Sequence, residues 1–434
     1  MRIELAYGRE GLEVDLPAEA EATVIRKPPL VIPPDPDGVV AAALDAPIGS
    51  PPLAEIAEGA QSACILICDF TRPVPNGLFL RPLAERLMAA GVPREGITVL
   101  VATGLHRPNE GEELAALVGD PWVLENLRVE NHFARDDAMH VMLGQTPGRG
   151  VPIGIDRRFV EADVKIATGL VEPHFMAGYS GGRKVIAPGV AHHTTIRTFH
   201  SARFMEDPLA ASCNLAGNPL HEEQLAIAEM IQARDPARPI LALSTVIDEH
   251  RNLAYVSFGA IVESHQAAID FVRSNVEIPV GRKFKTVLTT AAGYPLDETY
   301  YQTIKGMVTP LDILEPGGTL IIASRCAEGI GTEEFRAAQA RLVALGPDAF
   351  LDAISEKSLA DIDEWQTEMQ LKPMRLGGIE LYTEGLDDDD FAVTGVERAA
   401  DLAGAVAASI ARHGDADIAV IPEGSYLVPF ARAV

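Results

Sequence analysis

Short runs rich in apolar residues recur along this chain, separated by stretches in which apolar residues follow a helical spacing. Residues 64–68 (Cys-Ile-Leu-Ile-Cys) are apolar throughout, as in a strand that is buried on both faces of a sheet. Further runs that we interpret as strands lie at 97–101, 164–167, 286–289, 319–322 and 418–421. The alternation predicts α/β architecture with mostly parallel sheets.

The segment between the first two runs has the pattern of an amphipathic helix. Phe79, Leu83 and Leu87 recur every four residues, and the pattern stops at Gly91. We expect this helix to follow Asn76, which we interpret as its N-cap, so that residues 63–101 form a βαβ unit. Further helices are expected from about 297 and at about 395–412.

The length of 434 residues exceeds that of a usual single domain, and one interruption of the pattern suggests where the chain divides. Residues 276–284 contain Pro279 and Gly281 and precede a fresh strand-helix series. We therefore expect two α/β domains with an active-site cleft between them. Residues 1–275 would form the catalytic, cofactor-tethering domain, and residues 276–434 would close the cleft.

The charge balance narrows the classes of partner. With 36 basic and 62 acidic residues the net charge is −26, which disfavours nucleic acid and anionic membranes. The four cysteines form no CxxC pair or disulfide framework, which suits a reducing compartment. No apolar signal segment follows Met1 and no apolar run is long enough to span a membrane, so we expect a cytoplasmic protein.

Polar side chains directly follow three of the predicted strands. The sets are Asp69 to Pro73, Thr103 to Pro108, and Glu172 to His174. Ligands bind beyond the carboxyl ends of parallel strands, so the three loops are expected at one rim. Each set also has a plain structural interpretation, as an Asx turn with a surface arginine or as a hydrogen-bonded loop histidine.

A glycine-rich stretch at 169–189 contains five glycines in 21 positions. The amides of Ser180, Gly181 and Gly182 are candidates for an anion-binding nest. The stretch is not a P-loop, because Arg183 stands directly before Lys184 where a glycine is required, and it lacks GxGxxG spacing.

Three histidines follow the glycine-rich stretch. His193 and His200 would lie two turns apart on one face of a helix, which suits metal ligation. The alternative is that His192 and His193 are solvated or capping residues.

Together these motifs resemble the lactate racemase family of nickel-dependent hydroxyacid racemases and epimerases. The chain has Asp-x-Thr-Arg-Pro at 69–73, Thr-Gly-x-His-Arg at 103–107, Pro-His-x-x-x-Gly-x-Ser-Gly-Gly-x-Lys at 173–184, and a histidine sixteen residues after that lysine. The resemblance implies that Lys184 carries a nickel pincer nucleotide (pyridinium-3,5-bisthiocarboxylic acid mononucleotide) and that His200 is the protein ligand of nickel. It also implies that His106 and His174 are the acid/base pair.

The resemblance extends to contacts with cofactor and substrate. It implies cofactor contacts from Asp69, Thr71, Ser180, Gly181 and Gly182, and it implies substrate contacts from Arg72, Tyr301, Gln302, Lys305 and Trp365. Arg72 resembles a carboxylate clamp, a role that suits a planar guanidinium. Alternatively, Lys305 is an exposed helix residue and Trp365 a packing aromatic. Phe70 departs from the family's pattern, which often has histidine at this position, and this departure leaves the identity of the substrate undetermined.

By this resemblance the chain is an isomerase that inverts C2 of a 2-hydroxy acid through hydride abstraction and return. Its partners would be a small anionic 2-hydroxy acid and the enzymes that build the cofactor. A zinc or manganese hydrolase that uses the same histidines is one alternative, and a non-catalytic nucleotide-binding protein is another. The sequence leaves open which hydroxy acid is used and whether the chain forms a homo-oligomer.

Overall fold

The computed structural model describes residues 1–432, and these fall into two compact units. The first, here called the motif unit, comprises residues 29–199 and 214–273. The second unit comprises residues 1–28 and 200–213 together with the chain from Ser274 onward. The candidate site residues from Asp69 to Lys184 therefore lie in the motif unit. His200 and the candidate site residues from Tyr301 to Trp365 lie in the second unit.

The motif unit is built on a six-stranded sheet in the order β13-β12-β9-β4-β5-β6. All neighbours in this sheet are parallel except the β12–β13 pair. Its strands are β4 (Ala63–Cys68), β5 (Ile97–Ala102), β6 (Arg128–Asn131), β9 (Val164–Leu170), β12 (Leu241–Ile247) and β13 (Leu253–Ala260). Every residue of β4 is buried, which explains why its sequence is apolar without alternation. Every residue of β9 is buried as well, including Lys165 and Thr168.

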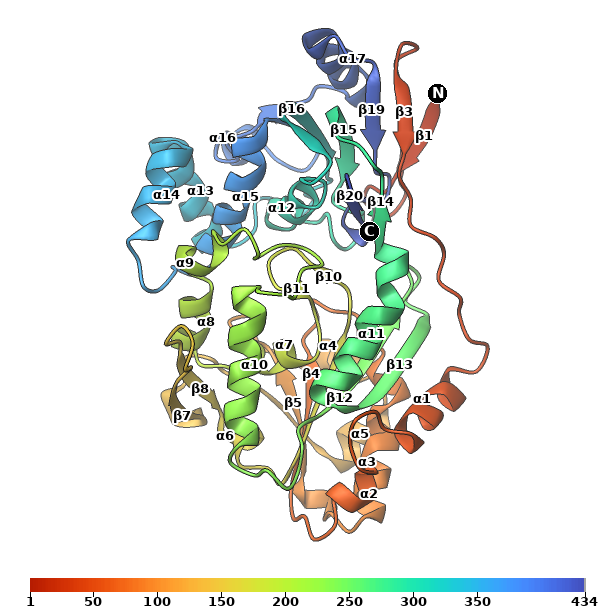
Figure 1. Ribbon diagram of the computed structural model, residues 1–434, viewed down its shortest axis with the longest axis vertical. Helices are drawn as coiled ribbons and strands as arrows, with labels where there is room; N and C mark the ends of the chain where they lie inside the picture. Colours follow the sequence, from red (N-terminus) through yellow and green to blue (C-terminus); the bar gives the residue numbers. More distant parts are fainter. Residues whose placement is uncertain (433–434) are drawn as a thin grey trace. The chain divides into compact units, whose positions relative to one another are not determined.

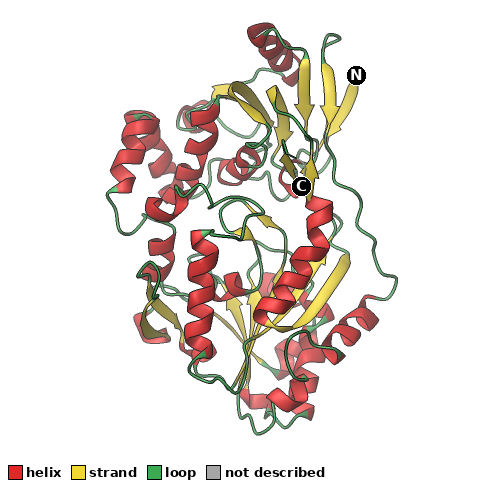
Figure 2. Cartoon of the chain, in the orientation of Figure 1, coloured by secondary structure: helices red, strands yellow, loops and turns green. Residues whose placement is uncertain are grey.

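Helices flank this sheet, as the cartoon of Figure 2 shows. They are α1 (Pro36–Asp45), α2 (Leu53–Ile56), α3 (Leu80–Ala89), α4 (Gly111–Val118), α5 (Pro121–Asn126), α6 (Arg157–Val160), α7 (Arg183–Ile186), α8 (His193–Phe199), α10 (Pro219–Gln232) and α11 (Ile261–Val276). Two hairpins complete the unit, β7 (His140–Gln145) with β8 (Pro152–Asp156), and β10 (Pro173–His174) with β11 (Gly178–Tyr179). Short 3₁₀ turns are η1 (Asn76–Leu78), η2 (Arg94–Gly96) and η3 (Asp137–Met139).

The second unit has its own six-stranded sheet, in the order β18-β17-β16-β15-β19-β3, with all neighbours parallel. Figure 1 labels β16, β15, β19 and β3 of this sheet. Its strands are β3 (Glu21–Val24), β15 (Phe284–Thr290), β16 (Leu314–Ala323), β17 (Gly378–Tyr382), β18 (Glu397–Arg398) and β19 (Asp417–Val420). Its helices are α9 (Ala202–Met205), α12 (Tyr300–Val308), α13 (Glu333–Leu345), α14 (Pro347–Ser355), α15 (Glu364–Leu376), α16 (Asp388–Ala392), α17 (Leu402–His413) and the turn η4 (Gly424–Tyr426). Two-stranded pairs join β1 (Arg2–Leu5) to β2 (Leu12–Asp15) and β14 (Glu277–Pro279) to β20 (Val428–Phe430).

The structure confirms the predicted α/β class with mostly parallel sheets. Each predicted strand is present with bounds that agree within two residues, except that β9 ends three residues later and β16 begins five residues earlier. Two helix boundaries were predicted wrongly. Asn76 is not the N-cap of α3: it begins η1, and its amide donates to the carbonyl of Leu117 at 2.8 Å. The helix expected from about 395 begins at Leu402, because Asp401 caps it and residues 397–398 form β18.

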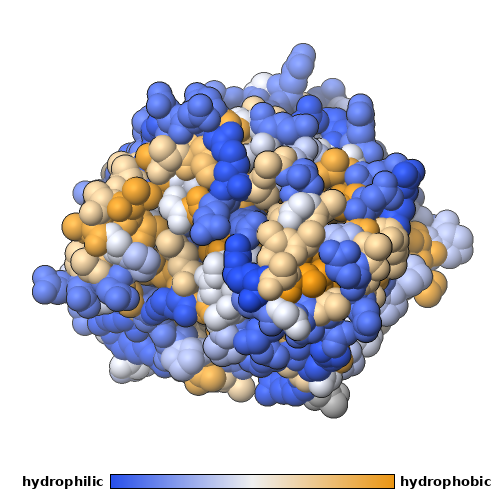
Figure 3. All heavy atoms as spheres, turned by 90° about the horizontal axis from the view of Figure 1, so that it is seen from above, coloured by the Kyte–Doolittle hydropathy of each residue, from blue (hydrophilic) through white to orange (hydrophobic). Residues whose placement is uncertain are grey.

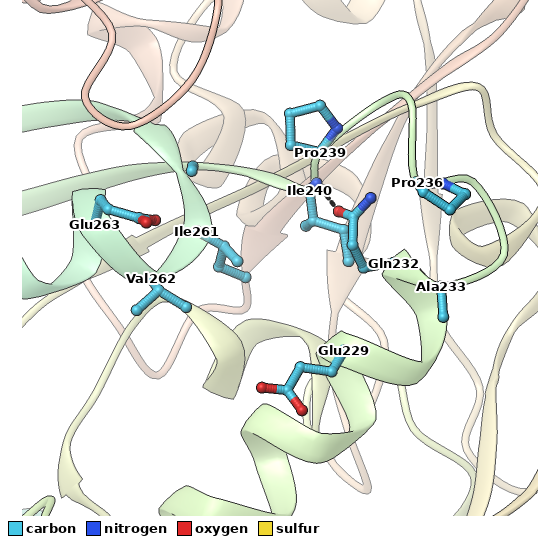
Figure 4. A pocket seen from close by; sticks show the side chains of 10 residues that line it. Glu229, Gln232, Ala233, Pro236, Pro239, Ile240, Ile261, Val262 and Glu263 are labelled. Atoms are coloured by element: carbon cyan, nitrogen blue, oxygen red, sulfur yellow. Dashed lines mark hydrogen bonds between the residues drawn. The ribbon is translucent and has the colours of Figure 1, made fainter.

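Within residues 1–432 no helix is long and apolar enough to cross a membrane. Figure 3 shows one face, on which hydrophilic residues cover most of the surface and apolar patches lie between them. A cavity of about 500 Å³ lies in the motif unit between the end of α10 and the start of α11, lined by residues such as Gln232 and Ile261 (Figure 4). None of its lining residues belongs to the motifs, so the cavity does not mark the candidate site.

Candidate active site

Three motif loops leave neighbouring strands of one sheet. In the order β9-β4-β5 the three strands run parallel, so their carboxyl ends lie along the same edge. The polar sets after Cys68, Ala102 and Leu170 therefore begin at one edge, as the sequence predicted.

Asp69 is a buried carboxylate, 4 % exposed, that holds His106. Its Oδ2 lies 2.6 Å from Nδ1 of His106, and its Oδ1 accepts from the hydroxyl of Thr71 at 2.6 Å. Burial acts to raise the pKa of Asp69, but the hydrogen bonds from His106 and Thr71 and the charge of Arg72 outweigh it, so the pKa lies below its usual range. Asp69 is therefore ionised at neutral pH, and Thr71 contacts it directly.

This pairing fixes the tautomer of His106. An ionised carboxylate only accepts hydrogen bonds, so Nδ1 of His106 carries the proton and Nε2 presents a lone pair. The His106 side chain is 54 % exposed while Asp69 is enclosed. The arrangement is that of a general base oriented by a buried carboxylate.

His174 is held in the opposite way. It is 8 % exposed and closes the two-residue β10 strand. Its Nδ1 accepts hydrogen bonds from the backbone N–H groups of Met176 at 3.4 Å and Ala177 at 3.2 Å. With Nδ1 acting as an acceptor, the neutral ring carries its proton on Nε2 and presents a donor.

Arg72 forms an ion pair with Glu172, one residue before the Pro-His pair. The side chains are 23 % and 40 % exposed, so the pair lies at the surface of the motif unit. Sequence reasoning quoted Glu172 within its motif but gave it no role. A planar guanidinium with one arm on Glu172 keeps its other N–H groups for a second anion.

The glycine-rich loop is closed by Ser180 and requires its two glycines. Ser180 is fully buried, its hydroxyl donates to the carbonyl of Leu170 at 2.7 Å, and its N–H donates to the carbonyl of Glu172 at 2.9 Å. Its amide is thus already engaged, which gives Ser180 a role in shaping the loop, and its cofactor contact stays a prediction. Gly181 and Gly182 have φ of +77° and +52°, and a Cβ on Gly182 would lie 2.7 Å from the ring of His265.

Arg183 is the residue that sequence reasoning missed. It is 1 % exposed, and among the described residues it has no carboxylate partner; instead it donates to the carbonyl of Ala177 at 2.9 Å. Burial lowers its pKa to about 9, and burial also takes the pKa of the neighbouring His265 well below its ordinary value. The loop therefore rests on a buried guanidinium beside Lys184, which lies in the single turn of α7 and is part-buried.

In the second unit, the predicted nickel ligand His200 and the predicted substrate contact Trp365 lie together. The rings of His200 and Trp365 have centroids 5.0 Å apart, and both are mostly buried. Gln302, in the first turn of α12, has a buried Oε1 with no hydrogen-bond partner within residues 1–432. Tyr301 packs edge-on against Phe335 with centroids 5.1 Å apart, and burial raises its pKa above the ordinary range. Lys305 follows on the same helix and is part-buried.

The predicted pairing of His193 with His200 on one helical face is wrong. The helix α8 covers His193–Phe199, so His200 lies beyond its end. His192 is the residue before the helix, and its Nδ1 accepts from the N–H of Thr194 at 3.3 Å, a capping contact.

Comparison with known proteins identifies the family. The Lactate racemase N-terminal domain family matches residues 7–212, and the Lactate racemase C-terminal domain family matches residues 281–428. The chain belongs to the lactate racemase family. It is therefore an isomerase by family.

Two relatives and one solved structure extend the match over most of the chain. A protein named lactate racemase from Lactiplantibacillus plantarum is 34% identical over 384 residues, 88% of each chain. Another from Thermoanaerobacterium thermosaccharolyticum is 34% identical over 335 residues, 77% of this chain and 76% of the relative. The structure of the lactate racemase apoprotein from T. thermosaccharolyticum matches with a TM-score of 0.89 at 28% identity and covers 99% of this chain and all of that one. A Thermotoga maritima protein with a TM-score of 0.60 and 17% identity shares the fold alone.

Proposed function

We propose that this chain is a 2-hydroxyacid racemase or epimerase that works with a nickel pincer nucleotide attached to Lys184. The observation that carries the proposal is the hydrogen bond of 2.6 Å between buried Asp69 and exposed His106. It supplies an oriented base at the edge of the sheet where a ligand is expected. Family membership supports racemisation as the reaction that uses this base.

The residues present fit such a cofactor. The backbone N–H groups of Gly181, Gly182 and Arg183 form no hydrogen bond within the described part of the chain, although all three residues are buried. Orphaned amides at a glycine turn suit an anionic phosphate, and the buried charge of Arg183 adds to this attraction. Lys184 follows directly with a primary amine for covalent attachment, and the imidazole of His200 suits nickel.

Four side chains of the motif unit then have defined tasks in the reaction. When bound, such a cofactor supplies a hydride acceptor and donor, so that no carbanion is needed at C2. His106 removes the hydroxyl proton at its Nε2, and Asp69 stabilises the imidazolium that results. His174 offers its Nε2–H to the substrate oxygen, and Arg72 binds the substrate carboxylate with the N–H groups that Glu172 leaves.

The substrate in this proposal is a small anionic 2-hydroxy acid, and the chain depends on enzymes that build the cofactor. Gln302, whose Oε1 is buried without a partner among residues 1–432, is the second-unit residue best suited to accept a hydrogen bond from a ligand. Lys305, Tyr301 and Trp365 complete the predicted set from that unit.

The test compares chain produced with and without the cofactor-building enzymes. Intact-mass and metal analysis should show a modified Lys184 and nickel only in the first preparation. A panel of pure 2-hydroxy acids, scored for loss of optical purity, should reveal racemisation only there. Racemisation by the unmodified, nickel-free chain contradicts the proposal, as does a hydrolytic activity that depends on zinc or manganese.

A further inference from the structure

A group of side chains of the types that ligate metals lies in the motif unit, and none of its members has a task in the proposed reaction. Ligand atoms of Asp137, His192 and His193 all lie within 4.8 Å of one another. Nε2 of His192 is 2.9 Å from Oδ1 of Asp137, and the rings of His192 and His193 have centroids 4.2 Å apart. His200 and Lys184 are not part of this group.

The backbone fixes both histidines in place. The N–H of His192 donates to the carbonyl of Gly154 at 2.8 Å, and the N–H of His193 donates to the carbonyl of Ala134 at 2.9 Å. His192 is 7 % exposed and His193 is part-buried. Asp137 begins the turn η3, and its side chain is 88 % exposed and so has room to adjust.

A third histidine adjoins this group with an unused nitrogen. Nδ1 of His140 donates to the carbonyl of Asp136 at 2.7 Å, which leaves a lone pair on Nε2. That Nε2 is buried and has no hydrogen-bond partner within residues 1–432. The His140 ring contacts the His192 ring edge-on, with centroids 4.9 Å apart. A histidine whose other nitrogen donates to a backbone carbonyl has the hydrogen bonding typical of metal ligands.

We propose that Asp137, His192 and His193 bind a divalent transition-metal ion such as Zn²⁺ or Ni²⁺. Two imidazoles and one carboxylate are a donor set that such ions favour, with water or His140 left for a further position. Tetrahedral bonds of about 2.1 Å place ligand atoms about 3.4 Å apart. The 2.9 Å contact between His192 and Asp137 must therefore open slightly, and the exposed Asp137 side chain permits this adjustment.

Two features oppose binding and set its conditions. Metal on Nε2 of His192 moves the ring proton to Nδ1, at the cost of the 3.3 Å contact from the N–H of Thr194. Arg135 and Arg197 add positive charge near His193, which the carboxylate of Asp137 offsets.

The bound ion would join the start of α8 to η3 and so stabilise this side of the motif unit. The proposal does not depend on the racemase activity, because none of these residues has a task in it.

The experiment uses the full chain made without the cofactor-building enzymes and stripped of metal. Zn²⁺ and Ni²⁺ are titrated by calorimetry, and Co²⁺ is added as an optical probe of imidazole ligation. Asp137→Asn and His193→Gln are compared with His250→Gln, an exposed histidine outside the group, and with His200→Gln, which removes the predicted cofactor-site ligand.

We expect the wild-type chain to bind one equivalent of metal, and we expect His250→Gln and His200→Gln to bind it with unchanged affinity. In Asp137→Asn and His193→Gln its affinity should fall by at least about 100-fold, since removing a ligand costs more than removing a residue that only supports one. Metal should also raise the melting temperature of the wild-type chain but not of these two variants. Equal affinity in all chains, or loss of binding only in His200→Gln, overturns the proposal.

Discussion

Replacing Asp69 by Asn tests whether the carboxylate sets the proton position on His106. The amide has nearly the same shape, so Thr71 and His106 keep a partner at the positions where Asp69 now accepts 2.6 Å hydrogen bonds. An amide N–H that faces Nδ1 of His106, however, requires a lone pair there and moves the ring proton to Nε2. The variant then lacks the basic Nε2 that the proposed function requires.

The expected size of the effect follows from the kind of hydrogen bond that the substitution removes. A hydrogen bond to a charged group contributes about 1.5–3 kcal/mol, or roughly 10- to 150-fold in rate, and a wrong tautomer adds to this. In the Ser-His-Asp triad the same substitution lowers kcat about 10⁴-fold, so we expect a decrease of about 10² to 10⁴-fold here.

The assay is turnover from each pure enantiomer by cofactor-loaded Asp69→Asn, with nickel content and Lys184 modification measured on the same sample. Asp248→Asn, which alters a carboxylate that caps an exposed turn, serves as the matched control. Near-normal kcat with full cofactor content refutes the positioning role. A loss of activity that merely follows a loss of cofactor instead assigns Asp69 to cofactor binding.

Two further predictions concern Arg72 and Asp156. Arg72→Lys should raise KM for the hydroxy acid by about tenfold or more with a smaller effect on kcat, because an ammonium cannot hold both Glu172 and a second carboxylate in a planar fork; equal KM values contradict the clamp. Burial acts to raise the pKa of Asp156, but Arg158 and His132 lower it from 3.8 to about 2. A lowered folded-state pKa stabilises the fold above about pH 4, and this stabilisation is lost as the pH falls toward 2, by about 2 kcal/mol in all. Acid unfolding followed by circular dichroism should therefore show a weaker dependence on pH in this range for Asp156→Asn, which is also less stable at neutral pH; an unchanged pH profile would contradict this.

The fold was predictable where burial dictates composition and unpredictable where it does not. The strand β4 is buried on both faces and appears in the sequence as an apolar run, and the largely buried strands β9 and β15 contain shorter apolar segments. By contrast β3 is part-exposed and the two residues of β18 are exposed, so neither carries such a run. The pairing of β3 with β19 across the length of the chain leaves no local signal, so nothing in the sequence indicated that residues 1–28 group with the second unit.

For the site, the residue types were predictable and their hydrogen bonds were not. Motif spacing placed His106 and Asp69 after adjacent strands, but their mutual contact depends on loop conformation. The buried position of Arg183 was hidden, because a basic residue before Lys184 suggests an exposed charge. The only signal in the sequence was the position of Arg183 between two glycines and Lys184. This position does not show whether Arg183 supports the loop or contacts a ligand.

The two predicted acid/base histidines are held differently, and a racemase must use both in both directions. The hydrogen bond to Asp69 leaves His106 able to gain or lose a proton at Nε2. His174 can act as a base at Nε2 only if the ring proton moves to Nδ1. That move breaks the hydrogen bonds that Nδ1 accepts from the N–H groups of Met176 and Ala177. Turnover that begins with His174 as base should therefore be slower. For a racemisation with an equilibrium constant of one, kcat/KM is equal for the two enantiomers, so the enantiomer with the lower kcat must have the lower KM in the same proportion. Steady-state constants from each pure enantiomer test this, and equal kcat values would show that the turn at residues 175–177 does not restrain His174 during catalysis.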